Sequence, residues 1–187
     1  MKRMRIFGLL FLALPALLLA GCLEEKSPYP PLSPVAYVDL ERYAGRWYEI
    51  ARIANSFQKG CVISTADYSL EEDGYVKVIN RCRKGGPDGK EAVAEGKAWV
   101  VDKTSNAWLQ VQFFWPFKGD YVIIDLDGKN YRYAVVGHPT RNYLWILSRT
   151  PYLDDDTYDA ILSRLLDQGY DIDRIERSFP SPKNQQR

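Results

Sequence analysis

The sequence predicts an antiparallel β domain, either a barrel or a sandwich, with one helix near its C-terminal end. Between residues 46 and 148, short runs rich in β-branched and aromatic residues are separated by turns rich in Gly, Asn, Asp and Pro. That pattern is typical of strands joined by hairpins. After residue 154 the spacing of apolar residues becomes helical. Closure into a barrel would remove the exposed edges that many strands create, but the pattern alone does not choose between the two architectures.

Four turns divide the strand region. They are a Glu-Glu-Asp-Gly turn at 71–74, a Gly-Gly-Pro-Asp-Gly break at 85–89, a Trp-Pro corner at 115–116 and an Asp-Gly-Lys-Asn turn at 127–130. Strands are therefore expected at Arg46–Ala54, Val62–Leu70, Tyr75–Cys82, Ala92–Asp102, Ala107–Phe114, Tyr121–Leu126, Tyr131–Val136 and Tyr143–Ser148.

Alternation along these strands predicts which side chains face the interior. In the run 108–113 the two glutamines share one face of the strand, and Leu109, Val111 and Phe113 share the other. The apolar face is expected to point inward. The same parity places these further side chains inside: Ala66, Val78, Tyr121, Ile123, Ala134, Val136, Trp145 and Leu147.

The helix is predicted from apolar residues at intervals of three and four. Tyr158, Ile161, Leu162, Leu165 and Leu166 follow this spacing, with three aspartates before them and a glycine at position 169 behind. Acidic residues complement the N-terminal end of a helix, and glycine permits a left-handed exit. We expect an amphipathic helix packed against the outside of the sheet. A helix on a membrane surface is the alternative, although its polar face lacks the basic excess typical of such helices.

The first 22 residues have the organisation of a secretory signal. Basic residues at positions 2, 3 and 5 precede an apolar stretch, Ile6–Leu19, that is too short for a comfortable bilayer span. Small residues then lead to Cys22. The sequence Leu-Ala-Gly-Cys resembles the bacterial lipobox, which implies cleavage before Cys22 and lipidation of that cysteine. An ordinary signal with a chance cysteine is the alternative.

The rest of the chain is expected to form one domain on a tether. Residues 1–21 would be removed, residues 22–37 would form a lipidated, Pro-rich tether, residues 38–180 the barrel and residues 181–187 a tail. Removal of the signal leaves no basic excess, which argues against a nucleic-acid partner. No second apolar run is long enough to span a bilayer, so the acyl chains would be the membrane anchor.

Two cysteines remain when Cys22 is lipidated. In an oxidising compartment Cys61 and Cys82 are expected to form a disulfide, and two separate buried thiols are the alternative. They lie at the outer ends of the hairpin that turns at 71–74. With Ala66 and Val78 both inward, strict alternation places the cysteines on opposite faces. A bond between them therefore requires a bulge or a loop position at Cys61.

Two motifs resemble those of the lipocalin family. The run Tyr43–Arg52 is similar to the Gly-x-Trp signature in its extended bacterial form, and Leu144–Pro151 is similar to the motif that ends the last strand. The resemblance extends from about Val38 to Phe179. It is closest to the bacterial outer-membrane lipocalins, which are similar to apolipoprotein D. It implies an eight-stranded up-and-down antiparallel barrel with one closed end, one open mouth and a helix packed outside.

The same resemblance implies structural roles for three residues. Trp47 would plug the closed end, Arg149 would lie across its ring, and Gly45 would allow the chain to approach closely at the turn into the first strand. We expect these residues to stabilise the fold and not to bind a ligand.

The implied function is binding, storage or transport of an amphipathic lipid, most simply a fatty acid or a lysophospholipid, at the bacterial cell envelope. Leu23, which follows the lipidated cysteine in place of an aspartate, indicates delivery to the outer membrane, facing the periplasm. No cofactor and no metal site are expected. The acyl chain would be lined by Ala66, Val78, Leu109, Val111, Phe113, Tyr121, Ile123, Val136 and Trp145.

Two other classes of function remain open: an enzyme on a lipocalin barrel, and an envelope scaffold filled by its own side chains. The chain has one histidine, His138, in a predicted loop, which disfavours a histidine-based triad or metal site. Small inward residues at 66, 98 and 134 leave room that a filled barrel would occupy. Aromatic residues also gather around the 115–116 corner, expected at the mouth, where exposed members could contact a second copy in a homodimer or a membrane.

Overall fold

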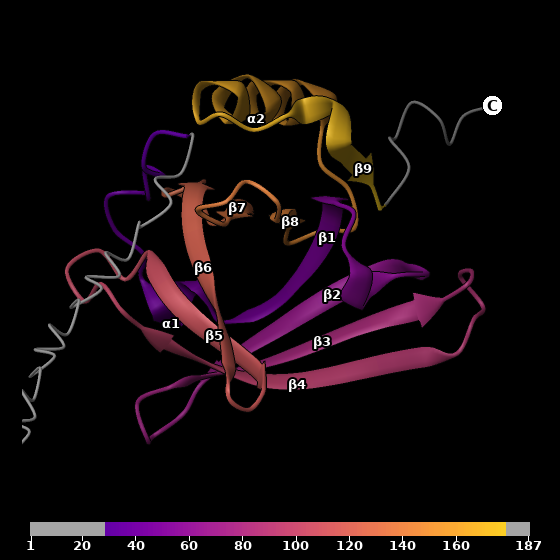
Figure 1. The fold of residues 1–187 in the computed structure, drawn as a ribbon, viewed down its shortest axis with the longest axis horizontal. Coiled ribbons are helices and arrows are strands. Elements are labelled where there is room, and N and C mark those ends of the chain that lie inside the picture. The colour runs from indigo at the N-terminus through magenta and orange to yellow at the C-terminus, as the bar shows by residue number, and fades with distance from the viewer. Residues whose placement is uncertain (1–28, 179–187) are drawn as a thin grey trace, which may run out of the picture.

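An antiparallel sheet closes on itself to form a barrel in residues 29–178, the part of the chain that the computed structural model describes (Figure 1). Strands β2 to β8 follow one another around the barrel in chain order, and β1 pairs with both β8 and β2 to close it. The expected signal peptide, residues 22–28 of the tether including Cys22, and the tail lie outside the described residues. Within 29–178 no helix is long and apolar enough to cross a membrane.

The expected strands are all present, with small changes at their ends. The elements are α1 (Leu40–Tyr43), β1 (Gly45–Ile53), η1 (Ser56–Gln58), β2 (Cys61–Leu70), β3 (Val76–Lys84), β4 (Glu91–Val100), β5 (Trp108–Phe114), β6 (Phe117–Leu126), β7 (Tyr133–Gly137), β8 (Leu144–Ser148), α2 (Asp155–Asp167), η2 (Ile172–Arg174) and β9 (Ile175–Arg177).

Three elements differ from the prediction. Strand β6 begins at Phe117 instead of Tyr121, because the chain turns within two residues and Phe117 pairs with Phe114. Strand β7 begins at Tyr133, because Tyr131 takes a left-handed turn conformation with φ 56°. The short strand β9 was not predicted. It pairs with the end of β1 over Ala51–Ile53.

The barrel wall separates two hydrophobic clusters. The inner cluster contains Trp47 and every side chain for which an inward position was predicted. The outer cluster lies between the wall and α2, where Tyr158, Ile161 and Leu165 pack with wall residues such as Val135 and Ile146. The predicted helix is therefore confirmed, and Asp154 caps it by accepting a hydrogen bond from the Thr157 amide. Leu166, expected on the packed face, is instead 53 % exposed because it lies beyond the edge of the contact.

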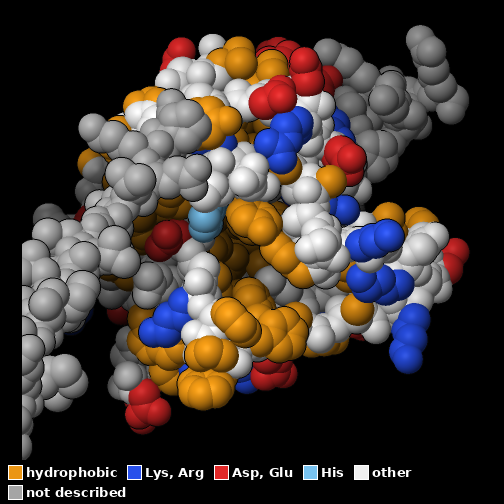
Figure 2. All heavy atoms as spheres, in the orientation of Figure 1, with side chains coloured by type: hydrophobic (Ala, Val, Ile, Leu, Met, Phe, Trp, Pro, Cys, Tyr) orange, Lys and Arg blue, Asp and Glu red, His pale blue; other side chains and the backbone are white. Residues whose placement is uncertain are grey.

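The alternating strand directions sort the loops into two ends. Loops 54–60, 85–90, 115–116 and 138–143 gather at one end, which we call the mouth. Loops 71–75, 101–107 and 127–132 gather at the other end with α1, which we call the closed end. Figure 2 shows a hollow, lined by hydrophobic side chains, in the middle of the face that it presents.

Candidate functional site

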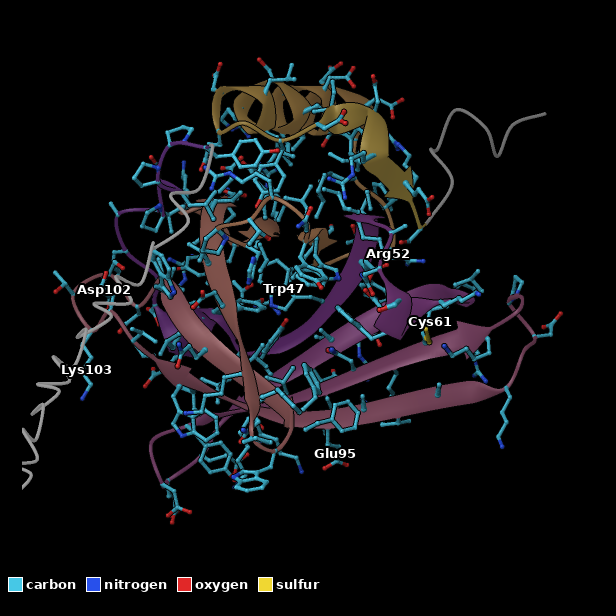
Figure 3. All side chains as sticks on the ribbon, viewed as in Figure 1. Trp47, Arg52, Cys61, Glu95, Asp102 and Lys103 are labelled. Atoms are coloured by element: carbon cyan, nitrogen blue, oxygen red, sulfur yellow. A yellow bond between two sulfur atoms is a disulfide. The ribbon has the colours of Figure 1, made fainter. Side chains whose placement is uncertain are left out.

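The closed end is plugged by Trp47, whose side chain is fully buried. Its indole nitrogen donates a hydrogen bond of 2.8 Å to the carbonyl of Tyr43. The guanidinium of Arg149 lies 3.8 Å from the centre of the indole ring. Gly45 has φ 90°, and a β-carbon there would lie 3.5 Å from the guanidinium. Figure 3 shows Trp47 inside the ring of strands. These contacts leave the mouth as the route into the barrel.

Three tyrosines, of which Tyr43 and Tyr68 are buried and Tyr121 is partly buried, lie above this plug. The hydroxyl of Tyr121 lies 2.8 Å from that of Tyr43 and donates to that of Tyr68 at 2.9 Å. Burial raises the pKa of all three, and that of Tyr68 rises to about 12. The phenols are therefore neutral at physiological pH and supply a small polar spot in an otherwise apolar interior.

A narrow cavity of about 10 Å³ lies beside these tyrosines, with room for about one water molecule. Four of the nine side chains predicted to line a ligand border it: Val78, Leu109, Tyr121 and Ile123. The other five belong to the same inner cluster without bordering the cavity; they are Ala66, Val111, Phe113, Val136 and Trp145. The structure thus brings all nine into one interior, and their role in binding stays a prediction.

The cavity is much smaller than the pockets of about 300–1,000 Å³ that usually hold small molecules. A long ligand would therefore have to occupy the interior between this cavity and the mouth as well. The partly buried members of the inner cluster include Val111, Phe113, Tyr121 and Trp145. Of these, Phe113 and Trp145 lie toward the mouth ends of β5 and β8. Both therefore lie on the mouth side of the cavity.

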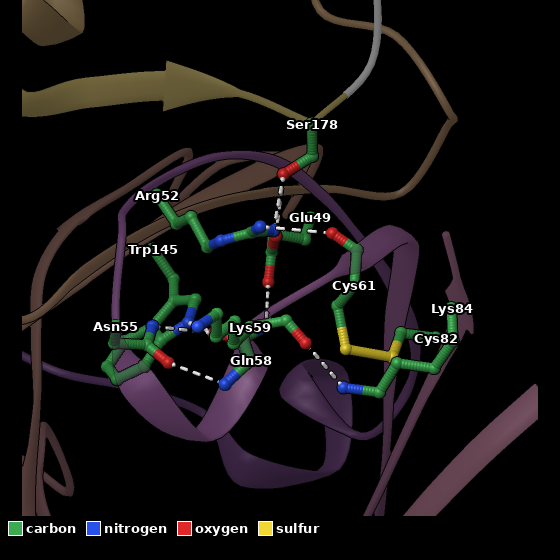
Figure 4. The surroundings of a disulfide bond; sticks show 10 residues. All are labelled: Glu49, Arg52, Asn55, Gln58, Lys59, Cys61, Cys82, Lys84, Trp145 and Ser178. Atoms are coloured by element: carbon green, nitrogen blue, oxygen red, sulfur yellow. Dashed lines mark hydrogen bonds and ion pairs between the residues drawn. A yellow bond between two sulfur atoms is a disulfide. The ribbon is translucent and has the colours of Figure 1, made fainter. Parts of the chain in front are cut away.

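A polar group that the sequence analysis did not identify lies at the mouth end of β1 (Figure 4). Glu49, only 4 % exposed, forms an ion pair with Arg52. Gln58 donates to the second oxygen of Glu49 at 2.6 Å and accepts from the Trp145 indole at 2.9 Å. The hydroxyl of Ser178 donates to Glu49 at 2.6 Å. A buried carboxylate and a partly buried guanidinium are thus held next to one of the predicted lining residues.

A bulge in β1 explains why the sequence analysis did not identify the whole of this polar group. Glu49 shares its face of β1 with Trp47, so alternation does place it inward. The register then shifts between Glu49 and Ala51, and both Ile50 and Ala51 pack in the outer cluster. The shift returns Arg52 to the same side as Glu49. Parity alone would have found Glu49 and would have turned Arg52 outward.

The same part of the molecule contains a gap in strand pairing. Strand β1 pairs with β2 only over Gly45–Tyr48, and β9 pairs with Ala51–Ile53 farther along β1. Arg52 spans the gap by donating to the carbonyl of Cys61 at 3.0 Å. Among the described residues, its Nε is one of two buried side-chain atoms that have no hydrogen-bond partner.

The disulfide between Cys61 and Cys82 is present and joins β2 to β3, with the two α-carbons 5.5 Å apart. A register shift between Val62 and Thr65 supplies the bulge that the pairing required. Within that bulge Ile63 has φ 51°, a left-handed conformation that is unusual for a β-branched residue.

Aromatic side chains form much of the mouth. The rings of Tyr143 and Trp145 are nearly parallel at 6.2 Å, and Phe57 stacks on Tyr143 at 5.8 Å. At the tip of the β5–β6 hairpin, Phe114 and Phe117 are largely exposed. The sequence prediction that aromatic residues gather at the mouth, some of them exposed, is confirmed.

The described residues contain no group of three or more His, Cys, Asp or Glu side chains that could hold a metal ion. The single histidine, His138, has its Nδ1 2.9 Å from the hydroxyl of Thr140, and burial lowers its pKa.

The plugged, apolar barrel with its outer helix matches a known family. Residues 38–180 match the lipocalin-like domain. The chain belongs to the lipocalin family. The outer membrane lipoprotein Blc of Escherichia coli K12 is 42 % identical over 175 residues, which is 92 % of this chain and 96 % of that protein. The Blc of Vibrio cholerae is 39 % identical over 166 residues, which is 89 % and 95 % of the two chains.

More distant lipocalins share the fold. Mouse apolipoprotein D is 36 % identical over 159 residues, which is 80 % of each chain. The crystal structure of insecticyanin from the tobacco hornworm superposes with a TM-score of 0.64 at 20 % identity, covering 83 % of this lipocalin and 87 % of that chain. Because the identity to insecticyanin is low, this match supports the fold alone.

Proposed function

We propose that this lipocalin binds a fatty acid or a lysophospholipid, and stores or transports it at the outer membrane. The acyl chain would lie in the barrel and the polar head at the mouth. The observation that carries the proposal is the barrel itself, plugged by Trp47 and Arg149 at one end and apolar from there to the mouth. The similarity to proteins named outer membrane lipoproteins supports the location and supports an acyl anchor at Cys22.

The driving force is transfer of the acyl chain from water into this interior. Each buried methylene contributes about 0.8 kcal/mol. The binding step requires no bond to be made or broken, so we assign the chain a binding function and no catalytic one.

The polar group at the mouth suits a head that carries charge. The indole of Trp145 connects the inner lining to Gln58, which in turn binds Glu49. A phosphate or carboxylate that displaces part of this group could accept a hydrogen bond from the Nε of Arg52, which is buried and has no partner. Both oxygens of Glu49 are already bonded, so the arrangement favours an anionic head over a plain hydrocarbon.

Native mass spectrometry of the mature chain from Leu23 onward tests the proposal, with lysophospholipid and fatty acid added separately. We expect a saturable one-to-one adduct. Phe113→Asp should weaken it at least about tenfold, because an unpaired carboxylate would be buried. Phe114→Asp is the matched control: its side chain is 74 % exposed, so binding should be unchanged. A folded protein that forms no adduct with either lipid would overturn the proposal and favour a scaffold or an enzyme.

A further inference from the structure

The most exposed large hydrophobic side chains lie together at the mouth. Phe114, Trp115 and Phe117, at the tip of the β5–β6 hairpin, are 74 %, 86 % and 76 % exposed. Phe57, on mouth loop 54–60, is also exposed. Figure 2 shows hydrophobic side chains gathered over the β5–β6 turn, in the lower part of the view, beside the hollow. We call Phe57, Phe114, Trp115 and Phe117 the aromatic rim. Exposed apolar side chains gathered at one end of a molecule in this way often mark a binding surface.

Charge distinguishes the two ends of the barrel. The four mouth loops contain two exposed basic residues, Lys59 and Lys90, one buried basic residue, Arg141, and one exposed acidic residue, Asp88. The three closed-end loops together contain five acidic residues and three basic ones. Lys118 adds a further cation beside the rim, with its ammonium 4.6 Å from the centre of the Trp99 ring. Aromatic side chains with basic neighbours suit the boundary of an anionic lipid bilayer.

The start of the described chain is held at the mouth. Arg141, on mouth loop 138–143, donates a hydrogen bond to the carbonyl of Pro30. Its guanidinium also lies 5.3 Å from the centre of the Tyr29 ring. Cys22 is only seven residues before Tyr29. Because an extended residue spans at most about 3.6 Å, Cys22 lies within about 25 Å of Tyr29.

This reach allows the rim to touch the membrane that holds Cys22. Residues 117–121 of β6 extend past the end of β7, because Val122 is the residue that pairs with Gly137. Five residues rise about 17 Å along a strand, and less along a barrel whose strands tilt by about 40°. The rim therefore stands about 13 Å beyond the level of the β7–β8 loop, well inside the reach of the tether. The closed end is a whole barrel length away from Tyr29, which would use nearly all of that reach.

We propose that the mouth faces the membrane and that the aromatic rim inserts into the lipid headgroup region of the bilayer in which Cys22 is anchored. This inference rests on the proposed lipidation of Cys22 and deepens the proposed lipid binding, because a lipid could pass between bilayer and barrel without crossing bulk water. The occupant of the rim is thus a lipid bilayer, and not a second copy of the chain.

Depth-dependent fluorescence quenching tests the proposal on the lipidated protein. The protein is reconstituted in vesicles of phosphatidylethanolamine and phosphatidylglycerol that contain a phospholipid brominated on its acyl chain. We expect strong quenching in the wild type, with at least half of the quenched emission lost in Trp115→Phe. Trp108→Phe, in which the changed ring lies at the closed end of β5, is the matched control and should keep the quenching. Equal quenching in wild type and Trp115→Phe would overturn the proposal.

Two further measurements separate the possible failures. Phe114→Ser with Phe117→Ser should lower the quenching of Trp115, whereas Val101→Ser, a change at an exposed apolar position of the closed end, should not. Loss of a dimer in these rim variants, without quenching in the wild type, would assign the rim to a second copy and overturn the proposal. An N-terminal peptide without acyl groups would overturn the anchoring. A lipid adduct without quenching would leave the proposed function standing and overturn this orientation.

Discussion

Arg149 holds Trp47 in place from the last strand of the barrel to the first. Its guanidinium lies 3.8 Å from the centre of the indole ring and donates to the carbonyls of Arg46 at 2.8 Å and Arg42 at 2.6 Å. The charge is therefore satisfied by backbone oxygens on one side and by the face of the ring on the other. The two residues are 102 positions apart in the sequence, so their contact fixes the closure of the barrel.

Replacing Trp47, the plug of the closed end, should lower the free energy of unfolding substantially. Trp47→Ala is expected to lower the free energy of unfolding by about 3–5 kcal/mol, as truncation of a buried aromatic side chain usually does. Trp115→Ala is the matched control, because its ring is 86 % exposed and should contribute almost nothing to folding. Urea unfolding followed by circular dichroism measures both. An unchanged midpoint for Trp47→Ala would contradict the role of this residue as a plug.

The disulfide should contribute less to the free energy of unfolding than the buried side chain of Trp47 does. Cys61 and Cys82 are 21 positions apart, and closing a loop of that length stabilises a fold by about 3 kcal/mol through its effect on the unfolded chain. The double variant Cys61→Ala with Cys82→Ala should therefore unfold at a lower urea concentration than the wild type. Reducing agent should lower the wild-type midpoint in the same way and leave the double variant unaffected. Equal midpoints for wild type and double variant would show that the bond adds no stability.

Local rules were sufficient for the inner face of the barrel and insufficient for its mouth. Period-two alternation correctly placed Leu109, Val111 and Phe113 in one cluster, although the pairing of their strand with β6 shifts register between Val111 and Phe114. Alternation does not predict the inward position of Arg52, because the register shifts between Glu49 and Ala51. The strand β9 is three residues long and pairs with β1 from a distance of more than 120 residues, so no local pattern indicates it.

The position of the tether also depended on the structure. Nothing in the sequence around Arg141 indicates that this side chain binds the carbonyl of Pro30. Arg141 is nonetheless only 3 % exposed, and it also donates to the carbonyl of Gln168 just after α2. A contact between the start of the chain, a mouth loop and the end of a helix is a property of the assembled fold.

Alkaline pH should weaken the fold through its buried tyrosines. Burial raises the pKa of Tyr68 and of Tyr170 to about 12, against about 10 in the unfolded chain. Below pH 10 these phenols are protonated in both states, so their contribution to stability is fully present. Between pH 10 and 12 the unfolded chain loses the protons first, and stability should fall by about 1.4 kcal/mol per pH unit for each tyrosine.

Urea midpoints at pH 9, 10 and 11 measure this fall, with ionisation followed by absorbance at 295 nm. Tyr68→Phe should make the decline shallower, because one late-ionising group is removed. Tyr37→Phe should leave the slope unchanged, because that side chain is 59 % exposed. The same slope in both variants would show that burial of Tyr68 does not govern the alkaline transition.

Gly137 on β7 should tolerate no side chain. A β-carbon there would lie 2.4 Å from the hydroxyl oxygen of Tyr170 and 2.9 Å from Cδ1 of Ile124. That hydroxyl accepts a hydrogen bond from the amide of His138 at 2.9 Å and donates to its carbonyl at 3.2 Å. Gly137→Ala must therefore move Tyr170 away from both bonds.

We expect Gly137→Ala to lower the free energy of unfolding by about 1–3 kcal/mol, the usual cost of overpacking, and to raise amide exchange at His138. Gly119→Ala on the adjacent strand β6 is the matched control. No atom lies within 4 Å of the β-carbon it would add, and alanine restricts the unfolded chain, so stability should stay level or rise slightly. If the two variants unfold at the same urea concentration, moving Tyr170 away from His138 does not change the free energy of unfolding. The contact between Tyr170 and His138 then does not hold the end of α2 to the mouth.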